Sequence, residues 1–243
     1  MDRRDFFKTI FASPLLTPLL LASPFFSNDE LFLIADRPEI YLPVLLEELG
    51  MGNIGFVRSS FSLNAHPRKK ALSQALKTSG WTQASQPQRA DLTLSFRSLQ
   101  HPSPPSFTRV SSGQIWDVRT KKLLSLWREL NKKNPPSPCL TVASLQTKQT
   151  ASVLGNSARF CLDGRVIEEV SLKKDRIKTF RAKHGNVNVK IEQGKVSVLS
   201  SSCRHKICCS VPPVCFTGER IVCAPNHFLL EIKGPRLVDT VIG

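Results

Sequence analysis

The feature that most limits what this chain can fold into is a set of short alternating segments in its C-terminal half. Residues 157–162, which begin with alternating polar and apolar side chains, and 165–170 are strand-like segments on either side of Asp163-Gly164. An Asp-Gly pair between two such segments is typical of a tight type I′ hairpin turn. A second alternating pair spans 186–200, and further strand-like segments follow at 221–222 and 227–232. The pattern predicts an all-β unit, either a small barrel or a sandwich.

The N-terminal half mixes helical and strand periodicities. The predicted elements are strands at 31–35 and 92–96, helices at 40–49 and 66–77, and a β-hairpin formed by 114–118 and 123–127. The second arm of that hairpin is alternatively the start of a helix that runs to Lys133. This order of elements predicts a small α/β domain.

The predicted fold class is therefore α+β with two domains. A small α/β domain is expected at 28–133 and an all-β domain at 155–243. The stretch between them, 134–154, is rich in Pro, Ser and Thr and is predicted to be a linker.

Residues 1–27 resemble a bacterial export signal of the twin-arginine type. The residues that carry this resemblance are Arg3, Arg4, Phe6, Phe7 and Lys8. An uncharged, proline-interrupted stretch follows up to Ser23, which is shorter than the roughly 20 residues of a membrane-spanning helix. An ordinary secretory signal is the alternative. We expect the twin-arginine machinery as a partner and a periplasmic or extracytoplasmic location, with the signal either removed or kept as an N-terminal anchor.

The chain is strongly basic, with a formal net charge of +15. Its Lys and Arg residues are scattered over both halves, and Tyr41 is the sole tyrosine, so no basic and aromatic platform for nucleic acid is recognisable. We expect no nucleic-acid partner. An anionic membrane surface or another envelope protein fits this charge better.

Five of the seven cysteines are crowded into one stretch near the C-terminus. They are Cys203, Cys208, Cys209, Cys215 and Cys223. Outside the cytoplasm such thiols are candidates for disulfides, and dense thiols also bind metals or perform redox chemistry. The spacing leaves these options open.

The residues around these cysteines resemble the NusG domain II family. The resemblance rests on Cys203-x4-Cys208, Gly218 five residues before Cys223, Ile221-Val-Cys-Ala-Pro-Asn226, Leu229-Leu-Glu-Ile232 and the closing Val238-Asp239-Thr-Val241. Arg204-His205 replaces the usual Pro-Asp of the family, and Cys209 and Cys215 are additional. The resemblance covers about 155–243. It implies an all-β module of exported or membrane-anchored bacterial proteins and implies no biochemical activity.

Two kinds of metal centre are alternatives to disulfides. Cys203-x-His205 followed by Cys223 and His227 is close to the Rieske 2Fe–2S pattern of two thiolates and two imidazoles. The second pair departs from that pattern, because Asn226 occupies the expected histidine position. A zinc ion would instead use Cys203, His205, Cys208 and Cys223.

No catalytic constellation is recognisable elsewhere, since the chain has no phosphate-binding glycine loop, Gly-x-Ser-x-Gly or His-Glu-x-x-His. His66, His101 and His184 stand beside basic or Pro-rich sequence and are predicted to be solvated. We expect a non-catalytic binding or accessory module of the cell envelope without a cofactor. The competing hypothesis is an electron-transfer protein with a 2Fe–2S centre, or a zinc site, in the cysteine cluster.

Overall fold

The computed structural model describes residues 29–51, 60–63, 66–86, 90–116, 121–145 and 153–234. The export signal predicted at 1–27 lies outside these ranges. Within them, no helix is both long and apolar enough to cross a membrane. An α/β region is followed by an all-β region, which confirms the predicted α+β class.

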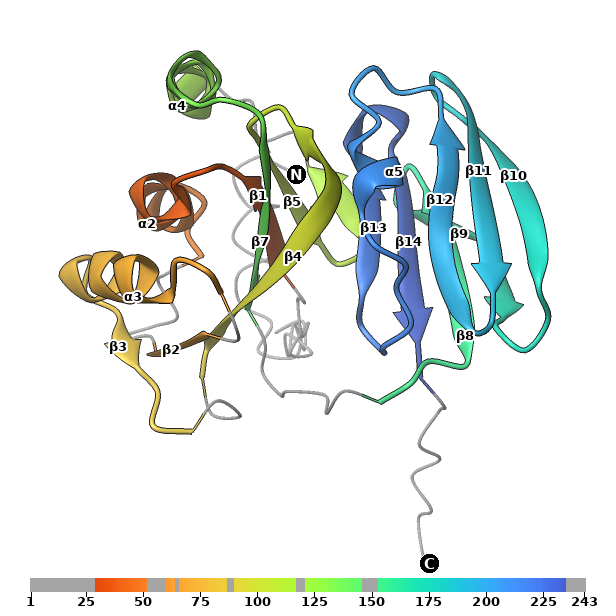
Figure 1. Ribbon diagram of the computed structural model, residues 1–243, viewed down its shortest axis with the longest axis horizontal. Helices are drawn as coiled ribbons and strands as arrows, with labels where there is room; N and C mark the ends of the chain where they lie inside the picture. The colour runs from red at the N-terminus through yellow and green to blue at the C-terminus, as the bar shows by residue number, and fades with distance from the viewer. Residues whose placement is uncertain are drawn as a thin grey trace, which may run out of the picture.

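The N-terminal unit is a mixed seven-stranded sheet with helices on one side (Figure 1). Its elements are β1 (Asp29–Ile34), α2 (Pro38–Glu48), β2 (Ser60–Leu63), α3 (Lys69–Thr78), β3 (Thr82–Gln83), β4 (Leu92–Ser103), β5 (Ser106–Ser111), β6 (Gln114–Trp116), α4 (Lys121–Lys133) and β7 (Ser137–Leu145). The strand order is β3-β2-β4-β7-β1-β5-β6. β2 pairs in parallel with β3 and β4, and the other pairs are antiparallel.

The C-terminal unit consists of two antiparallel sheets on the other side of the N-terminal sheet (Figure 1). Its elements are β8 (Ser157–Leu162), β9 (Arg165–Ser171), β10 (Arg176–Ala182), β11 (Gly185–Glu192), β12 (Lys195–Ser201), α5 (Ile207–Ser210), β13 (Arg220–Cys223), the 3-10 turn η2 (Ala224–Asn226) and β14 (Phe228–Lys233). One sheet has the order β13-β14-β8-β9, and the other has the order β10-β11-β12.

Both hairpins predicted in the C-terminal half are confirmed. β8 pairs with β9 across Asp163-Gly164, and β11 pairs with β12 across Gln193-Gly194. The φ angles are 49° and 74° in the first turn and 50° and 74° in the second. Two successive positive φ angles define the type I′ turn, which matches the twist of the strands that it joins.

Two predictions for residues 114–154 differ from the structure. β6 pairs with β5, so the hairpin between 114–118 and 123–127 was wrong, and the second arm belongs to α4 as in the helical alternative. β7 lies inside the predicted linker at 134–154 and pairs with both β1 and β4. The prolines that suggested a break precede β7 or occupy its exposed start at Pro138, where a missing N–H is tolerated.

The central strand β1 of the N-terminal sheet is buried on both faces, whereas the edge strands β3 and β6 are largely exposed. Along β1, Leu31 and Leu33 point into the core under the helices, whereas Phe32 and Ile34 pack against the core of the C-terminal unit. This split follows from the alternation of side chains along a strand. In β7, Val142 also joins the C-terminal core. The two units are therefore joined by an apolar interface.

Three phenylalanines fill the space between the two sheets of the C-terminal unit. Phe160 on β8, Phe180 on β10 and Phe228 on β14 are buried, with ring centroids 4.5 to 6.2 Å apart. Aromatic pairs at such distances add about 0.5–1.5 kcal/mol each to the effect of burial.

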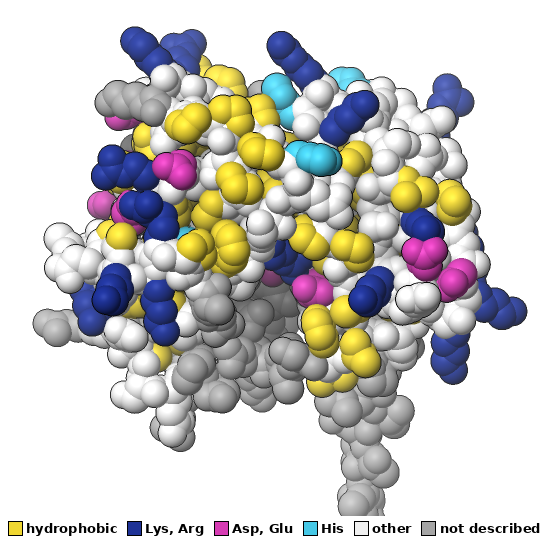
Figure 2. Space-filling view, viewed as in Figure 1, with side chains coloured by type: hydrophobic (Ala, Val, Ile, Leu, Met, Phe, Trp, Pro, Cys, Tyr) yellow, Lys and Arg dark blue, Asp and Glu magenta, His cyan; other side chains and the backbone are white. Residues whose placement is uncertain are grey.

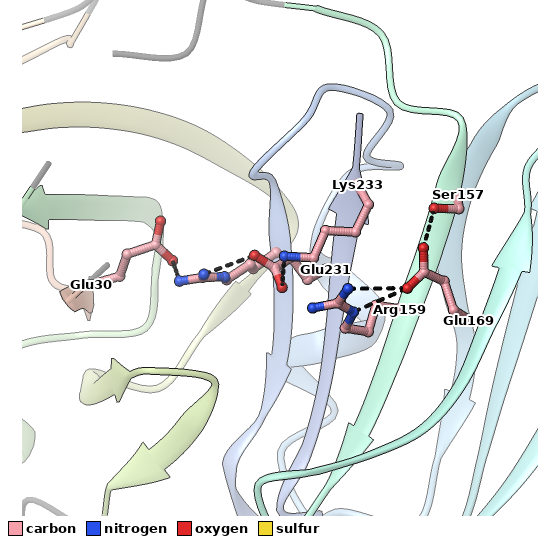
Figure 3. A network of polar contacts seen from close by, with 7 residues as sticks. Glu30, Ser157, Arg159, Glu169, Glu231 and Lys233 are labelled. Atoms are coloured by element: carbon pink, nitrogen blue, oxygen red, sulfur yellow. Dashed lines mark hydrogen bonds and ion pairs between the residues drawn. The ribbon is translucent and has the colours of Figure 1, made fainter. Parts of the chain in front are cut away.

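A buried arginine joins the two units by charge. Arg220 on β13 donates to Glu30 Oε2 on β1 at 3.0 Å and to Glu231 Oε1 on β14 at 2.9 Å. Glu30 also accepts a hydrogen bond from Ser144 on β7, and Lys233 lies 2.7 Å from Glu231. Figure 3 shows this run of polar contacts from Glu30 to Glu231 and Lys233. The side chain of Arg220 is only 5% exposed, so the contacts are sheltered from solvent screening.

The two carboxylates around Arg220 respond differently to burial. Burial raises the pKa of Glu30, because removing its charge from water outweighs the attraction of Arg220. Burial also acts on Glu231, but the charges of Arg220 and Lys233 hold its pKa below the ordinary value. The ionised form is thus less favourable for Glu30 than for Glu231.

We expect Arg220→Ala to lower the free energy of unfolding by about 3–5 kcal/mol, because two buried carboxylates would lose their shared cation. Glu30→Gln should cost less, since it removes the less favoured charge. Urea unfolding of each variant measures both effects. Arg159→Ala is the matched control, because Arg159 pairs with Glu169 at a more exposed position and should cost at most about 1 kcal/mol. Equal losses for Arg220→Ala and Arg159→Ala would contradict the assignment.

His66 is buried, so the prediction that it is solvated was wrong. Its side chain packs edge-on against Phe96, with ring centroids 5.2 Å apart. Nδ1 accepts the backbone N–H of Arg68 at 3.0 Å, so Nε2 carries the proton and donates to Thr141 Oγ1 at 3.0 Å. Burial lowers the pKa of His66, because the charged ring would lose its hydration.

The stabilising contribution of His66 should depend on pH. It is complete above the unfolded-state pKa of about 6.5 and is lost as pH falls through the lower folded-state pKa, because the unfolded chain binds the proton first. We therefore expect the difference in unfolding free energy between the wild type and His66→Gln to shrink between about pH 8 and about pH 5. His101→Gln, at an exposed site, is the control in the same urea series. A difference that does not change with pH would refute the assignment.

Candidate functional site

Three cysteines from separate segments meet in the interior of the C-terminal unit. Cys203 follows β12, Cys208 lies in α5, and Cys223 is the last residue of β13. Their exposed fractions are 6%, 1% and 2%. The three Sγ atoms lie within 4.8 Å of one another, and those of Cys203 and Cys208 are 3.9 Å apart. We call Cys203, Cys208 and Cys223 the thiol cluster.

The local backbone turns these thiols toward one another. Lys206 adopts a left-handed conformation with φ 50° directly before α5, which bends the chain between Cys203 and Cys208. After Cys223 the chain enters η2, where Pro225 occupies the first turn. Proline is well suited to that position, because the first N–H groups of a helical turn have no internal partner.

A buried hydroxyl and a buried amide hold the segments of the thiol cluster together. Ser201 Oγ accepts the N–H of Cys203 at 3.3 Å and lies 3.5 Å from Cys223 Sγ. Asn226 is fully buried, and its Nδ2 donates to Ser201 Oγ at 3.0 Å. Its Oδ1 accepts the N–H of His184 at 3.1 Å. Asn226 therefore connects the turn after Cys223 to the end of β12 and to the β10–β11 hairpin.

The thiols of the cluster have unequal acidities. Hydrogen bonds from Cys208 and then from Cys223 lower the pKa of Cys203. The pKa values of Cys208 and Cys223 are raised, first of all by their hydrogen bonds to Cys203. One thiolate at Cys203 is thus favoured, and further ionisation is opposed by burial and by repulsion between like charges. A cation bound among the three sulfur atoms would remove that opposition.

The other predicted ligands lie outside the thiol cluster. His205 is exposed in the loop before α5, and His227 Nδ1 lies 3.1 Å from Asp163 Oδ1. Cys209 and Cys215 are partly buried and do not join the group. In the described ranges, the thiol cluster is the one set of three or more candidate metal ligands. All seven cysteines are free thiols, so the structure shows none of the predicted disulfides.

The thiol cluster faces the N-terminal sheet across a small cavity of about 90 Å³. Phe32 and Ile34 of β1 and Leu140 of β7 form one wall, and all three cysteines form part of the other. Sequence patterns could not reveal this contact, because it joins residues more than sixty positions apart. Nothing in the sequence pattern indicated that Ser201 belongs to this site. Asn226, in contrast, is part of the sequence motif around Cys223.

The structure defines an all-β module with a buried thiol cluster, packed against an α/β unit. Residues 139–236 match the NusG domain II family. The match begins within β7 and so starts before the boundary that the sequence predicted at 155. No curated protein matches the chain.

Several solved structures resemble part of the chain. A DUF1312 family protein from Ruminococcus gnavus is 28% identical, covers 32% of this chain and 97% of its own, and has a TM-score of 0.29. A DUF1312 family protein from Enterococcus faecalis is 19% identical, with coverages of 32% and 95% and a TM-score of 0.31. The Lin0431 protein from Listeria innocua is 20% identical, with coverages of 33% and 97% and a TM-score of 0.31.

Asn226→Ala should lower the free energy of unfolding by about 1–3 kcal/mol, because Ser201 and the N–H of His184 would lose their buried partner. Thermal or urea unfolding measures the loss. Asn188→Ala is the matched control, since Asn188 hydrogen-bonds Thr179 and Ser200 on an exposed face and should change stability by about 0.5 kcal/mol or less. If the two variants lose equal stability, Asn226 does not have the role assigned to it.

Proposed function

We propose that this chain is an exported cell-envelope protein that acts as a binding or accessory module, and that its thiol cluster binds zinc or a similar soft divalent metal. The observation that carries the proposal is the spacing of the three buried Sγ atoms. Export is supported by the resemblance of residues 1–27 to a twin-arginine signal. Periplasmic or extracytoplasmic location follows from the same resemblance.

The sulfur geometry fits a metal better than a disulfide. With Zn–S bonds of about 2.3 Å in tetrahedral geometry, two thiolates on one zinc ion lie about 3.8 Å apart. The distance of 3.9 Å between Cys203 and Cys208 is close to this value. A disulfide requires about 2.05 Å. Thiolates also prefer zinc and copper(I) to hard ions such as magnesium or calcium.

A metal on the thiol cluster would act mainly on structure. It would link the end of β12, α5 and the end of β13, which also share apolar packing and the hydrogen bonds of Ser201. The cavity beside the cysteines leaves space for a fourth, non-protein ligand. Because ligands are gathered only in the folded chain, the free energy of binding adds to the free energy of folding.

Two other uses of the thiol cluster make different predictions. A Rieske-type 2Fe–2S centre needs His205 and His227, and His227 instead pairs with Asp163. A disulfide between Cys203 and Cys208 needs their sulfur atoms to approach by about 2 Å, and an oxidising compartment would favour it. Neither alternative uses all three cysteines.

The experiment is elemental analysis of the full chain, purified without chelator, together with a count of free thiols before and after reduction. We expect about one zinc ion per chain, and its loss in Cys208→Ser. Cys215→Ser is the matched control and should keep the metal, because Cys215 lies outside the cluster. Chelation should lower the melting temperature of the wild type and leave that of Cys208→Ser unchanged.

The other outcomes are equally distinct. A chain that contains no metal and whose count of free thiols rises on reduction would show that the cluster forms a disulfide and does not bind a metal. Iron and visible absorption would establish the iron–sulfur centre. If Cys208→Ser keeps all of its metal, the metal does not bind at the thiol cluster.

A further inference from the structure

A second and larger hollow opens at the boundary between the two units. It has a volume of about 410 Å³, within the usual range for small-molecule pockets, about 300–1,000 Å³. One wall comes from β5, β6 and α4 of the N-terminal unit, and the other comes from loops of the C-terminal unit. We propose that this cleft binds a small organic anion with a flat aromatic part, which is a function separate from metal binding.

The N-terminal wall of the cleft is aromatic. Phe107 on β5, Trp116 at the end of β6 and Trp127 on α4 line it. Trp116 is 53% exposed, although a tryptophan is normally well buried. Exposed aromatic surface inside a concavity is typical of a binding site, because a flat ligand can cover it and recover the hydrophobic free energy.

The C-terminal wall of the cleft is basic. Lys183 and His184 lie at the β10–β11 turn, His205 lies in the loop before α5, and His227 follows η2. No carboxylate lines the cleft among the described residues. In the described part of the chain, Asp163 is the acidic group that pairs with this wall, and it contacts His227 from outside the lining.

Besides Lys183, residues close to this wall supply positive charge. Arg204 and Lys206 flank His205 and are exposed. In Figure 2, histidine side chains gather in the upper middle of the face with Lys and Arg beside them, and no Asp or Glu is drawn among them. The whole chain carries a net charge of +15. An anionic group of the ligand would therefore find complementary charge here, and its ring would face the tryptophans.

The cleft lies next to the cavity over the thiol cluster. His205, Ile207, Ala224 and Pro225 line both spaces. These residues belong to the segment that leads into α5, which carries Cys208, and to the turn that follows Cys223. The ligand would cover the solvent side of these loops without touching the sulfur atoms.

The proposal is tested with the aromatic anion anilinonaphthalene sulfonate and its neutral analogue N-phenylnaphthylamine, followed by probe fluorescence and tryptophan quenching. We expect the anion to bind at about one site and more tightly than the neutral probe, with an affinity that falls as salt rises. The double variant Lys183→Gln/His205→Gln should weaken the anion about five-fold. Trp116→Ala should weaken both probes about ten-fold.

Two control variants carry similar changes outside the cleft. Lys174→Gln removes an exposed charge, and Ile177→Ala removes an apolar side chain that is 64% exposed. Neither should alter affinity. Metal content and thermal stability of every variant show that the fold is retained. The proposal would be overturned if the cleft variants and the control variants lost equal affinity for the anion. It would also be overturned if the neutral probe bound as tightly as the anion and the affinity of the anion did not depend on salt.

Discussion

The burial of Arg220 between Glu30 and Glu231 is the interaction on which the arrangement of the two units depends. A guanidinium group removed from water is tolerated only where hydrogen-bonded carboxylates surround it. One carboxylate comes from the same unit, and the other comes from β1 at the start of the described chain. The apolar contacts of Phe32 and Ile34 bring the units together, but such contacts have little directional preference. Together with the contact between Arg97 of β4 and Glu219 at 3.0 Å, the ion pairs of Arg220 favour one orientation among the many that would bury similar area.

That orientation creates the two spaces described above, the cavity over the thiol cluster and the cleft. The thiol cluster belongs entirely to the C-terminal unit, yet β1 and β7 form the far wall of its cavity. The cleft likewise needs the tryptophans of one unit and the histidines of the other. Neither space would exist in a C-terminal unit standing by itself. The proposed sites therefore involve the interface between the units as well as the C-terminal unit itself.

Local patterns were sufficient for the two hairpins of the C-terminal unit and for helix α3. Asp163-Gly164 determined a turn through its own backbone preferences, so the neighbouring strands could be predicted without knowledge of the rest. β7 was missed because its prolines signal a break, whereas its place between β1 and β4 is set by contacts distant in sequence. For the site, the pattern named five cysteines. Selecting Cys203, Cys208 and Cys223 required the turn at Lys206 and the hydrogen bonds of Asn226, which spacing alone does not encode.

Because the two faces of β1 contact different units, substitutions at alternate positions of this strand should have different effects. Odd-numbered positions such as Leu31 and Leu33 serve the core under the helices, whereas even-numbered positions such as Glu30, Phe32 and Ile34 serve the junction with the C-terminal unit. Neighbouring residues thus report on different parts of the molecule. Substitutions at odd positions would destabilise the core of the N-terminal unit. Substitutions at even positions would weaken the contact between the two units and leave the helices of the N-terminal unit packed. The parity of a position on β1 therefore separates folding of the unit from assembly of the whole chain.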